Sequence, residues 1–268
     1  MIPKSVQASS PLPALSAQRL LGKTALVTGF GSGIGRGCAL MLAHQGARVI
    51  GCDIDSEGAE VTLQTASAAG LRMEGSHPCD LTDPGAVDGL FTTVAERFDA
   101  LDILVNAAAT AVFAPIEQLT YEDWRRTLAG ELDTVFLACK AAWPLLKVRG
   151  GSIVNFASVN AYLVLEGSAA LAHCAGKGGV LAMSRQLALE GAPHGIRCNT
   201  VSPGMIVTGA TEPVLAQPGF EANVLSKALI KRLGQPEDIA WCVTFLASDE
   251  STWLTAADIP VDGGACAL

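Results

Sequence analysis

The sequence predicts an α/β fold, with one doubly wound parallel sheet of about seven strands and helices on both faces. Three observations indicate it. Short runs rich in Val, Ile and Thr alternate along the chain with helical segments. Half of the 268 residues are apolar, whereas 16% are charged and 5% aromatic, which suits strands that are buried on both faces. No obvious linker divides the chain, so we expect a single domain.

The expected strands share a run of apolar, often β-branched residues that a turn residue commonly follows. In chain order they are TALVTG (24–29), ARVIGCD (47–53), the segment ending SHPCD (76–80), ILVNAA (103–108), SIVNFAS (152–158), IRCNTVSPG (196–204) and DIPVDGG (258–264). Helical segments fill the intervals. They run from Ile34 to about Gly46, from near Ser56, after Pro84, from about Tyr121 to Lys147, through His173 to Glu190, and once more before the last strand. In such a sheet, ligands bind beyond the carboxyl ends of the strands.

Two segments lie outside this alternation. Residues 209–235 follow the sixth strand with a weak helical pattern, on the ligand side of the predicted sheet. We interpret them as a substrate lid, and a plain surface excursion is the alternative.

Residues 1–20 mix Pro, Ser and Ala with two basic residues and lack a long apolar segment. They are predicted to form a flexible N-terminal arm rather than a signal peptide.

Composition and charge narrow the classes of partner. The net charge of −8 is spread along the chain without a Lys/Arg block, which disfavours nucleic acid. Eight cysteines lie far apart with no C-x-x-C pair, so we expect free thiols in a reducing, cytoplasmic compartment, with no disulfide and no zinc. His173 and Cys174 are adjacent and face different ways on a helix, so no metal site is expected there. No apolar run of about 18 residues occurs, so no membrane is expected as a partner. Of these classes of partner, a small-molecule substrate is the one that we expect.

A glycine pattern after the first strand indicates a nucleotide. Gly29, Gly33 and Gly35 stand in TGFGSGIG, at the start of the first helix. Glycine there lets the backbone turn tightly and approach a pyrophosphate, which the free N–H groups of the helix N-terminus bind. Asp53 ends the second strand, where a carboxylate can accept hydrogen bonds from both ribose hydroxyls and would repel a 2′-phosphate. No arginine stands next to Asp53. The pattern predicts NAD rather than NADP.

These motifs together resemble the short-chain dehydrogenase/reductase family, in its compact, NAD-preferring form. The matching segments run from Lys23 to Gly264 in family order. They are T-G-x-x-x-G-I-G (Thr28–Gly35), the pair Asp80 and Leu81, Asn106, Ser158, Lys177, N-x-V-S-P-G-x-x-x-T (Asn199–Thr208) and V-D-G-G (Val261–Gly264). The resemblance implies one Rossmann-type domain over residues 21–268, oxidoreductase activity, and assembly as a dimer or a homotetramer.

The resemblance also assigns cofactor contacts. Asp80 and Leu81 would flank the adenine, Asn106 and Ala107 would line the ribose side, and the segment 203–208 would hold the nicotinamide. The predicted cofactor-binding residues are Gly29, Ser32, Gly33, Ile34, Gly35, Asp53, Ile54, Asp80, Leu81, Asn106, Ala107, Ala108, Lys177, Pro203, Gly204, Val207 and Thr208.

Two catalytic positions depart from the family. In the family a tyrosine takes the hydroxyl proton while a hydride leaves for the nicotinamide, and a serine holds the substrate oxygen. A lysine lowers the pKa of the tyrosine and binds the nicotinamide ribose, and an asparagine in the preceding long helix carries a water on the proton path. Ser158 and Lys177 stand at the serine and lysine positions. His173 stands at the tyrosine position, four residues before Lys177 in HCAGKGG, and Glu131 stands at the asparagine position.

Two hypotheses follow from this set. In the first, His173 replaces the tyrosine as acid and base, because an imidazole titrates near neutrality and lies one helical turn from Lys177. Ser158 would position the substrate oxygen, and Lys177 with Glu131 would set the electrostatics. In the second, His173 is structural and the chain binds NAD without redox turnover, as a sensor or scaffold, or acts as a lyase or isomerase with Glu131 or His173 as base. Tyr162, just beyond Ser158, offers a second phenol that could enter the pocket, although a loop aromatic that contacts substrate is the simpler account.

The predicted pocket wall is apolar. Val159, Ala161, Leu163, Met205 and Val214 lie near Ser158 in the expected fold. An uncharged or weakly polar secondary alcohol or ketone is therefore expected. The lid carries no Arg or Lys apart from Lys227, Lys231 and Arg232 at its far end, which argues mildly against a carboxylate or phosphate handle on the substrate.

Glycines surround Lys177 in a predicted helix, where each costs up to about 1 kcal/mol. Gly176, Gly178 and Gly179 therefore indicate a close backbone approach. Packing within the chain and packing against a second subunit are both open explanations.

Overall fold

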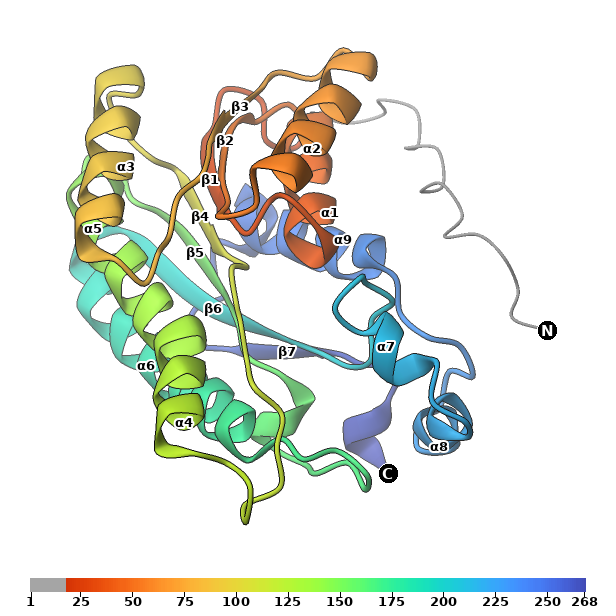
Figure 1. The fold of residues 1–268 in the computed structure, drawn as a ribbon. Helices are drawn as coiled ribbons and strands as arrows, with labels where there is room; N and C mark the ends of the chain where they lie inside the picture. The colour runs from red at the N-terminus through yellow and green to blue at the C-terminus, as the bar shows by residue number, and fades with distance from the viewer. Residues whose placement is uncertain (1–17) are drawn as a thin grey trace.

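The structure is a computed structural model that describes residues 18–268. Its centre is one sheet of seven parallel strands in the order β3-β2-β1-β4-β5-β6-β7. The strands are β1 (Thr24–Thr28), β2 (Arg48–Cys52), β3 (Met73–Ser76), β4 (Ile103–Asn106), β5 (Gly151–Phe156), β6 (Ile196–Pro203) and β7 (Asp258–Val261). The order starts at β1 and proceeds outward in both directions, so the sheet is doubly wound as predicted (Figure 1).

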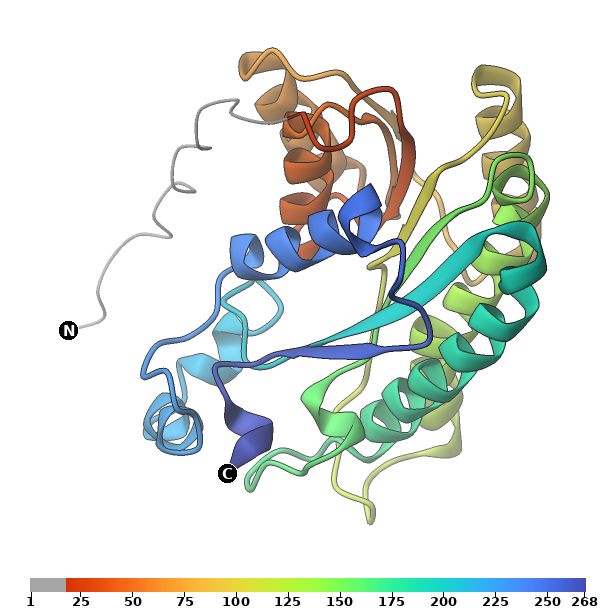
Figure 2. The same ribbon diagram turned by 180° about the vertical axis from the view of Figure 1, so that it is seen from behind.

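Helices cover both faces of the sheet. They are α1 (Gly33–His44), α2 (Ser56–Ala68), α3 (Pro84–Arg97), α4 (Tyr121–Leu128), α5 (Thr134–Leu146), α6 (Leu171–Gly191), α7 (Glu212–Leu215), α8 (Phe220–Ser226) and α9 (Pro236–Ala247). Helices α1 and α9 pack together on one face, and their apolar side chains form one core with the strands. Helices α3, α5 and α6 form the second core on the opposite face, as Figure 2 shows from behind. The predicted fold class is thus confirmed.

Two elements differ from the predicted boundaries. Strand β3 ends at Ser76, before the SHPCD segment is complete. Pro78 has no N–H to continue a ladder, so the chain leaves the sheet there. The long helix predicted from Tyr121 to Lys147 is divided by a π-helical turn, Ala129–Asp133, between α4 and α5. Glu131 lies in this turn.

The packed chain begins before the predicted arm ends. Leu20 is fully buried, its N–H donates to the Gln45 carbonyl over 2.9 Å, and Arg19 forms an ion pair with Glu250. The rest of the predicted arm, residues 1–17, lies outside the described residues.

The predicted lid contains two short helices, α7 and α8 (Figure 1). A bridge between Ile206 and Gly234 closes the base of the segment. A Cβ at residue 234 would lie 2.4 Å from Cδ1 of Ile206, so glycine permits this closure. Within residues 18–268 we find no helix with both the length and the apolar character that a bilayer crossing requires.

Candidate active site

Two cavities open where the strands end. The smaller, of about 320 Å³, lies beyond β1, β2 and β4. The predicted cofactor residues on its wall are Gly29, Ser32, Gly33, Ile34, Gly35, Asp53, Ile54, Asp80, Leu81, Ala107, Ala108 and Thr208. Most of the predicted nucleotide-binding set therefore meets in one place, as the carboxyl-end rule for parallel sheets requires.

Close packing explains the glycines of this cavity. A Cβ on Gly35 would lie 1.9 Å from the Gly29 carbonyl oxygen, and a Cβ on Gly29 would lie 2.7 Å from Cα of Ala108. Larger residues would push the loop away from α1 and cover the amides of its first turn. The loop thus leaves the positive end of the helix open to an anionic group.

Asp53 is held on the cavity wall by backbone amides. Its Oδ2 accepts from the Gly31 N–H over 2.7 Å, and Oδ1 accepts from the Asp55 N–H over 2.9 Å. Arg36, the nearby cation, is turned to the Gly31 and Gly58 carbonyls and to Thr62. The Asp53 carboxylate therefore lies at the cavity wall without a hydrogen bond from Arg36. The open helix end and this acid suit the pyrophosphate and ribose of a nicotinamide dinucleotide.

Several predicted cofactor residues lie elsewhere. Asn106 is 3% exposed and joins two strands by donating to Oδ1 of Asn155 over 2.8 Å. Gly204 lines the larger cavity, whereas Pro203, Val207 and Lys177 line neither cavity. Their contacts with a cofactor stay a prediction.

Sequence reasoning missed other residues on the wall of the smaller cavity. They are Cys52, Cys79, Thr82, Ala109, Thr110, Gly130, Thr134 and Ala210. Cys52, Cys79, Thr82 and Ala109 adjoin predicted residues, which is the signal that could have found them. Thr110, Gly130 and Thr134 come from the loop after β4 and from the π-helical turn region, whose geometry the helical periodicity does not contain.

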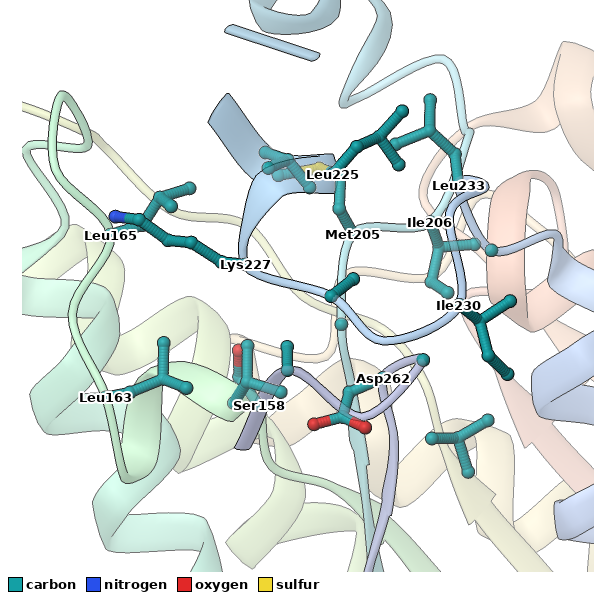
Figure 3. A pocket seen from close by; sticks show the side chains of 18 of the residues that line it. Ser158, Leu163, Leu165, Met205, Ile206, Leu225, Lys227, Ile230, Leu233 and Asp262 are labelled. Atoms are coloured by element: carbon teal, nitrogen blue, oxygen red, sulfur yellow. The ribbon is translucent and has the colours of Figure 1, made fainter. Parts of the chain in front are cut away.

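The larger cavity, of about 570 Å³, contains Ser158. Its wall is mainly apolar and comes from the segment after β5, from the lid and from the chain after β7, as Figure 3 shows. Val159, Leu163 and Met205 lie on it as predicted, whereas Ala161 and Val214 do not. Ser158 caps the 3-10 turn Val159–Ala161, and its Oγ accepts from the Asn160 N–H over 3.1 Å. The hydroxyl is thereby fixed at the cavity.

Three titratable side chains from the π-helical turn and α6 form one cluster. Nδ1 of His173 lies 2.6 Å from Oε1 of Glu131, and Nζ of Lys177 lies 3.8 Å from the same oxygen. Nζ of Lys177 also donates to the Phe156 carbonyl over 3.2 Å. Glu131 is 1% exposed and Lys177 is 7% exposed. Burial lowers the pKa of Lys177, and the Glu131 carboxylate opposes this by favouring the charged ammonium.

The π-helical turn and one glycine make room for this carboxylate. A Cβ on Gly176 would lie 2.8 Å from Oε2 of Glu131, so a side chain at this point of α6 would displace the carboxylate from its present place. Gly179 likewise approaches Leu132 of the same turn, whereas Gly178 faces open space. Packing within the chain thus explains Gly176 and Gly179. Oε2 of Glu131 is buried and has no hydrogen-bond partner among the described residues.

The imidazole keeps one nitrogen free. The side chain of His173 is 15% exposed, and its ring lies against Phe113, with the ring centres 5.4 Å apart. Within residues 18–268, Nε2 makes no hydrogen bond, none joins His173 to Ser158, and His173 lines neither cavity. Because Glu131 accepts at Nδ1, the proton on that nitrogen leaves Nε2 as the acceptor of the neutral ring.

Tyr162 does not replace the missing phenol. It is 51% exposed, it lines neither cavity, and its hydroxyl donates to Oδ2 of Asp258 over 3.0 Å. Burial and the Asp258 carboxylate raise the pKa of Tyr162 to about 12, which makes the phenolate scarce near neutral pH. The suggestion that it enters the pocket is wrong for this structure. No group of three His, Cys, Asp or Glu side chains suited to a metal occurs in the described part of the chain.

Comparison with known proteins identifies the class. The family model described as enoyl-(acyl carrier protein) reductase matches residues 29–266. The chain belongs to the short-chain dehydrogenase/reductase family, whose members use NAD or NADP.

Curated relatives include the D-threitol dehydrogenase of Mycolicibacterium smegmatis, 40% identical over 92% of this chain and 94% of that protein. The 2,5-dichloro-2,5-cyclohexadiene-1,4-diol dehydrogenase of Sphingobium indicum is 35% identical over 92% of this chain and 98% of that protein. The names of these relatives support an oxidoreductase.

Two similar solved structures were obtained with nicotinamide cofactors. A protein of Agrobacterium tumefaciens described as a 2-deoxy-D-gluconate 3-dehydrogenase, with bound NADP, has a TM-score of 0.85 and 31% identity over 94% of this chain and 100% of that chain. A 7α-hydroxysteroid dehydrogenase complexed with NADH has a TM-score of 0.87 and 29% identity over 92% of this chain and 95% of that chain.

Proposed function

We propose that the protein transfers a hydride between NAD(H) and a secondary alcohol or ketone of largely apolar character, with His173 as acid and base. The observation that carries the proposal is the 2.6 Å contact between Glu131 and Nδ1 of His173. A buried carboxylate is costly to maintain, and here it fixes the tautomer in which Nε2 can accept a proton. The relatives named for threitol and for a cyclohexadienediol support an alcohol as the substrate.

Asp53 favours NAD over NADP. Its carboxylate stands at the wall of the smaller cavity without a bonded cation among the described residues. It would accept hydrogen bonds from ribose hydroxyls and repel a 2′-phosphate. When bound, the nicotinamide supplies the hydride acceptor or donor.

Each residue of the cluster has a role in moving the proton. Ser158 would donate a hydrogen bond to the substrate oxygen, and Nε2 of His173 would take the hydroxyl proton during oxidation and return it during reduction. Glu131 would stabilise the imidazolium that forms, as the acid of a Ser-His-Asp triad does. Lys177 would oppose that charge and hold a ribose hydroxyl.

Variants at residue 173 test the proposal. We expect His173→Phe to abolish NADH formation from a panel of secondary alcohols, because phenyl cannot accept a proton. His173→Tyr should retain part of the activity, with its pH profile moved to higher pH, since a phenol ionises at higher pH than an imidazole. Tyr162→Phe is the matched control and should keep full activity, because its hydroxyl bonds Asp258. Equal activity of the Phe variant and the wild type would contradict the proposal.

A second candidate is an NAD-binding protein without redox turnover. The absence of a hydrogen bond between His173 and Ser158 in the described structure favours it. Two measurements distinguish the candidate functions: calorimetry for NADH binding and NADH oxidation for hydride transfer. Tight NADH binding with no hydride transfer to any ketone of the panel would support the second candidate and contradict the first.

A further inference from the structure

The wall of the larger cavity carries four charged side chains, and three of them have hydrogen-bond partners within the chain. Arg232 donates to both carboxylate oxygens of Asp238, over 2.7 and 2.8 Å. Asp262 accepts from the N–H groups of Gly264 and Cys266, each over 2.8 Å. The ammonium of Lys227, the fourth, makes no hydrogen bond or ion pair with any residue of 18–268. Lys227 is therefore the one charged side chain on this wall without a bonded partner in the described chain.

The lid brings this lysine back to the site. Lys227 directly follows α8, its N–H donates to the Val224 carbonyl, and its side chain is half-buried. Figure 3 shows the side chain running from the lid toward Leu165, above Ser158. The sequence argument against an anionic handle rested on the position of the lid cations at its far end, and it does not hold for Lys227, because Lys227 and Ser158 line the same cavity.

The surface between the two residues is apolar. Val159, Leu163, Leu225 and Ile230 line the cavity with Lys227. An ammonium beside such a wall loses part of its hydration, and a neutral ligand compensates this loss less than an anion does. A carboxylate there would be attracted more strongly than in bulk water, because the local dielectric constant is lower.

We infer that the substrate is a hydroxy or keto acid with an apolar skeleton, whose carboxylate pairs with Lys227 while the reacting carbon lies at Ser158. A single ammonium without a bonded partner suits the single charge of a carboxylate better than a phosphate monoester, which carries about −1.5 to −2. The inference rests on the proposed function. The reaction leaves the carboxylate unchanged: the C–H bond gives its hydride to the nicotinamide, the O–H proton goes to His173, and the carbonyl forms.

Paired substrates provide the test. Medium-chain acids with a hydroxyl on the penultimate carbon are compared with their methyl esters, using NAD and wild-type or variant protein. We expect the wild type to favour each acid, and Lys227→Met to lower kcat/KM for the acid about fivefold or more, mainly through KM. The esters should be unaffected within about twofold, and Lys227→Arg should keep the preference for the acid.

Lys231→Met is the matched control on the lid. Lys231 donates to carbonyls of the lid itself, including those of Leu225 and Ala228, and does not line the cavity. Its loss would disturb the lid without removing the cavity charge, so the acid-to-ester ratio should persist. Glu166→Gln, on the facing loop, should likewise preserve the preference for the acid.

The outcomes separate the two proposals. Equal kcat/KM for acid and ester in the wild type, or an equal loss of both in Lys227→Met, would overturn the role of Lys227. If no compound is turned over, the proposed function fails. Calorimetry with the keto acid and its methyl ester, in the presence of NADH, then still decides the inference. Equal affinity of the wild type and Lys227→Met for the keto acid would exclude it.

Discussion

Oε1 of Glu131 lies 2.6 Å from Nδ1 of His173, so a buried carboxylate on the π-helical turn is bonded to an imidazole on α6. This contact fixes which ring nitrogen carries the proton. The contact also places a negative charge beside the ring that would become imidazolium. The same carboxylate is the one anionic partner of Lys177 in the described chain.

Glu131→Gln should lower kcat by about 10²-fold or more, because a neutral amide neither stabilises imidazolium nor enforces the Nδ1–H tautomer. Gln186→Glu, a charge change of the opposite sign on the exposed side of α6, should leave kcat unchanged. Steady-state kinetics with a deuterated alcohol measures the step directly. Unchanged kcat in Glu131→Gln would remove Glu131 from the mechanism.

Stability should rise with pH through the contribution of Lys177. Its pKa is lowered in the folded protein, mainly by burial, so the unfolded chain binds more protons in the window between the folded pKa and the ordinary value of 10.5. The free energy of unfolding therefore increases with pH across that window. Urea titrations measure this. The free energy of unfolding of the wild type minus that of Lys177→Met should increase with pH. In Glu131→Gln the window should extend to lower pH, since the carboxylate that favours the charged ammonium of Lys177 is gone. A pH-independent difference between wild type and Lys177→Met would contradict this.

Gly176→Ala should destabilise the protein, although alanine is ordinarily favoured in a helix by about 1 kcal/mol. The new Cβ would lie 2.8 Å from Oε2 of Glu131 and would displace it from His173. Gly178→Ala is the control, because nothing lies within 4 Å of its Cβ and the helix propensity gain should appear. Thermal unfolding and kcat report both effects. Loss of the Gly176→Ala penalty in a Glu131→Gln background would verify the contact.

Asp53→Asn should shift cofactor preference toward NADP. The amide oxygen can still accept from the Gly31 N–H, so the loop keeps one of its contacts while the repulsion of a 2′-phosphate is lost. The ratio of kcat/KM values for NAD and NADP, together with calorimetric affinities, measures the shift. An unchanged ratio would mean that another group determines the preference.

The sequence predicts the sheet and most of the nucleotide cavity because both depend on local patterns. Alternating apolar runs determine the strands, and Gly29, Gly33, Gly35 and Asp53 follow strand ends that meet at one edge. The positions of His173 and Glu131 also follow from the motif order. Their direct contact does not, because a π-helical turn adds a residue that no 3.6-residue periodicity contains. The placement of Lys227 depends on how the lid folds back, which involves contacts far apart in the chain.

The space at Gly176 links the requirements at three positions of the site. A Cβ at residue 176 would lie 2.8 Å from Oε2 of Glu131, so the carboxylate would have to shift to admit a side chain there. Without that carboxylate in place, the imidazole at residue 173 loses its partner at Nδ1. Residues 131, 173 and 176 are therefore expected to change together among related chains rather than one at a time.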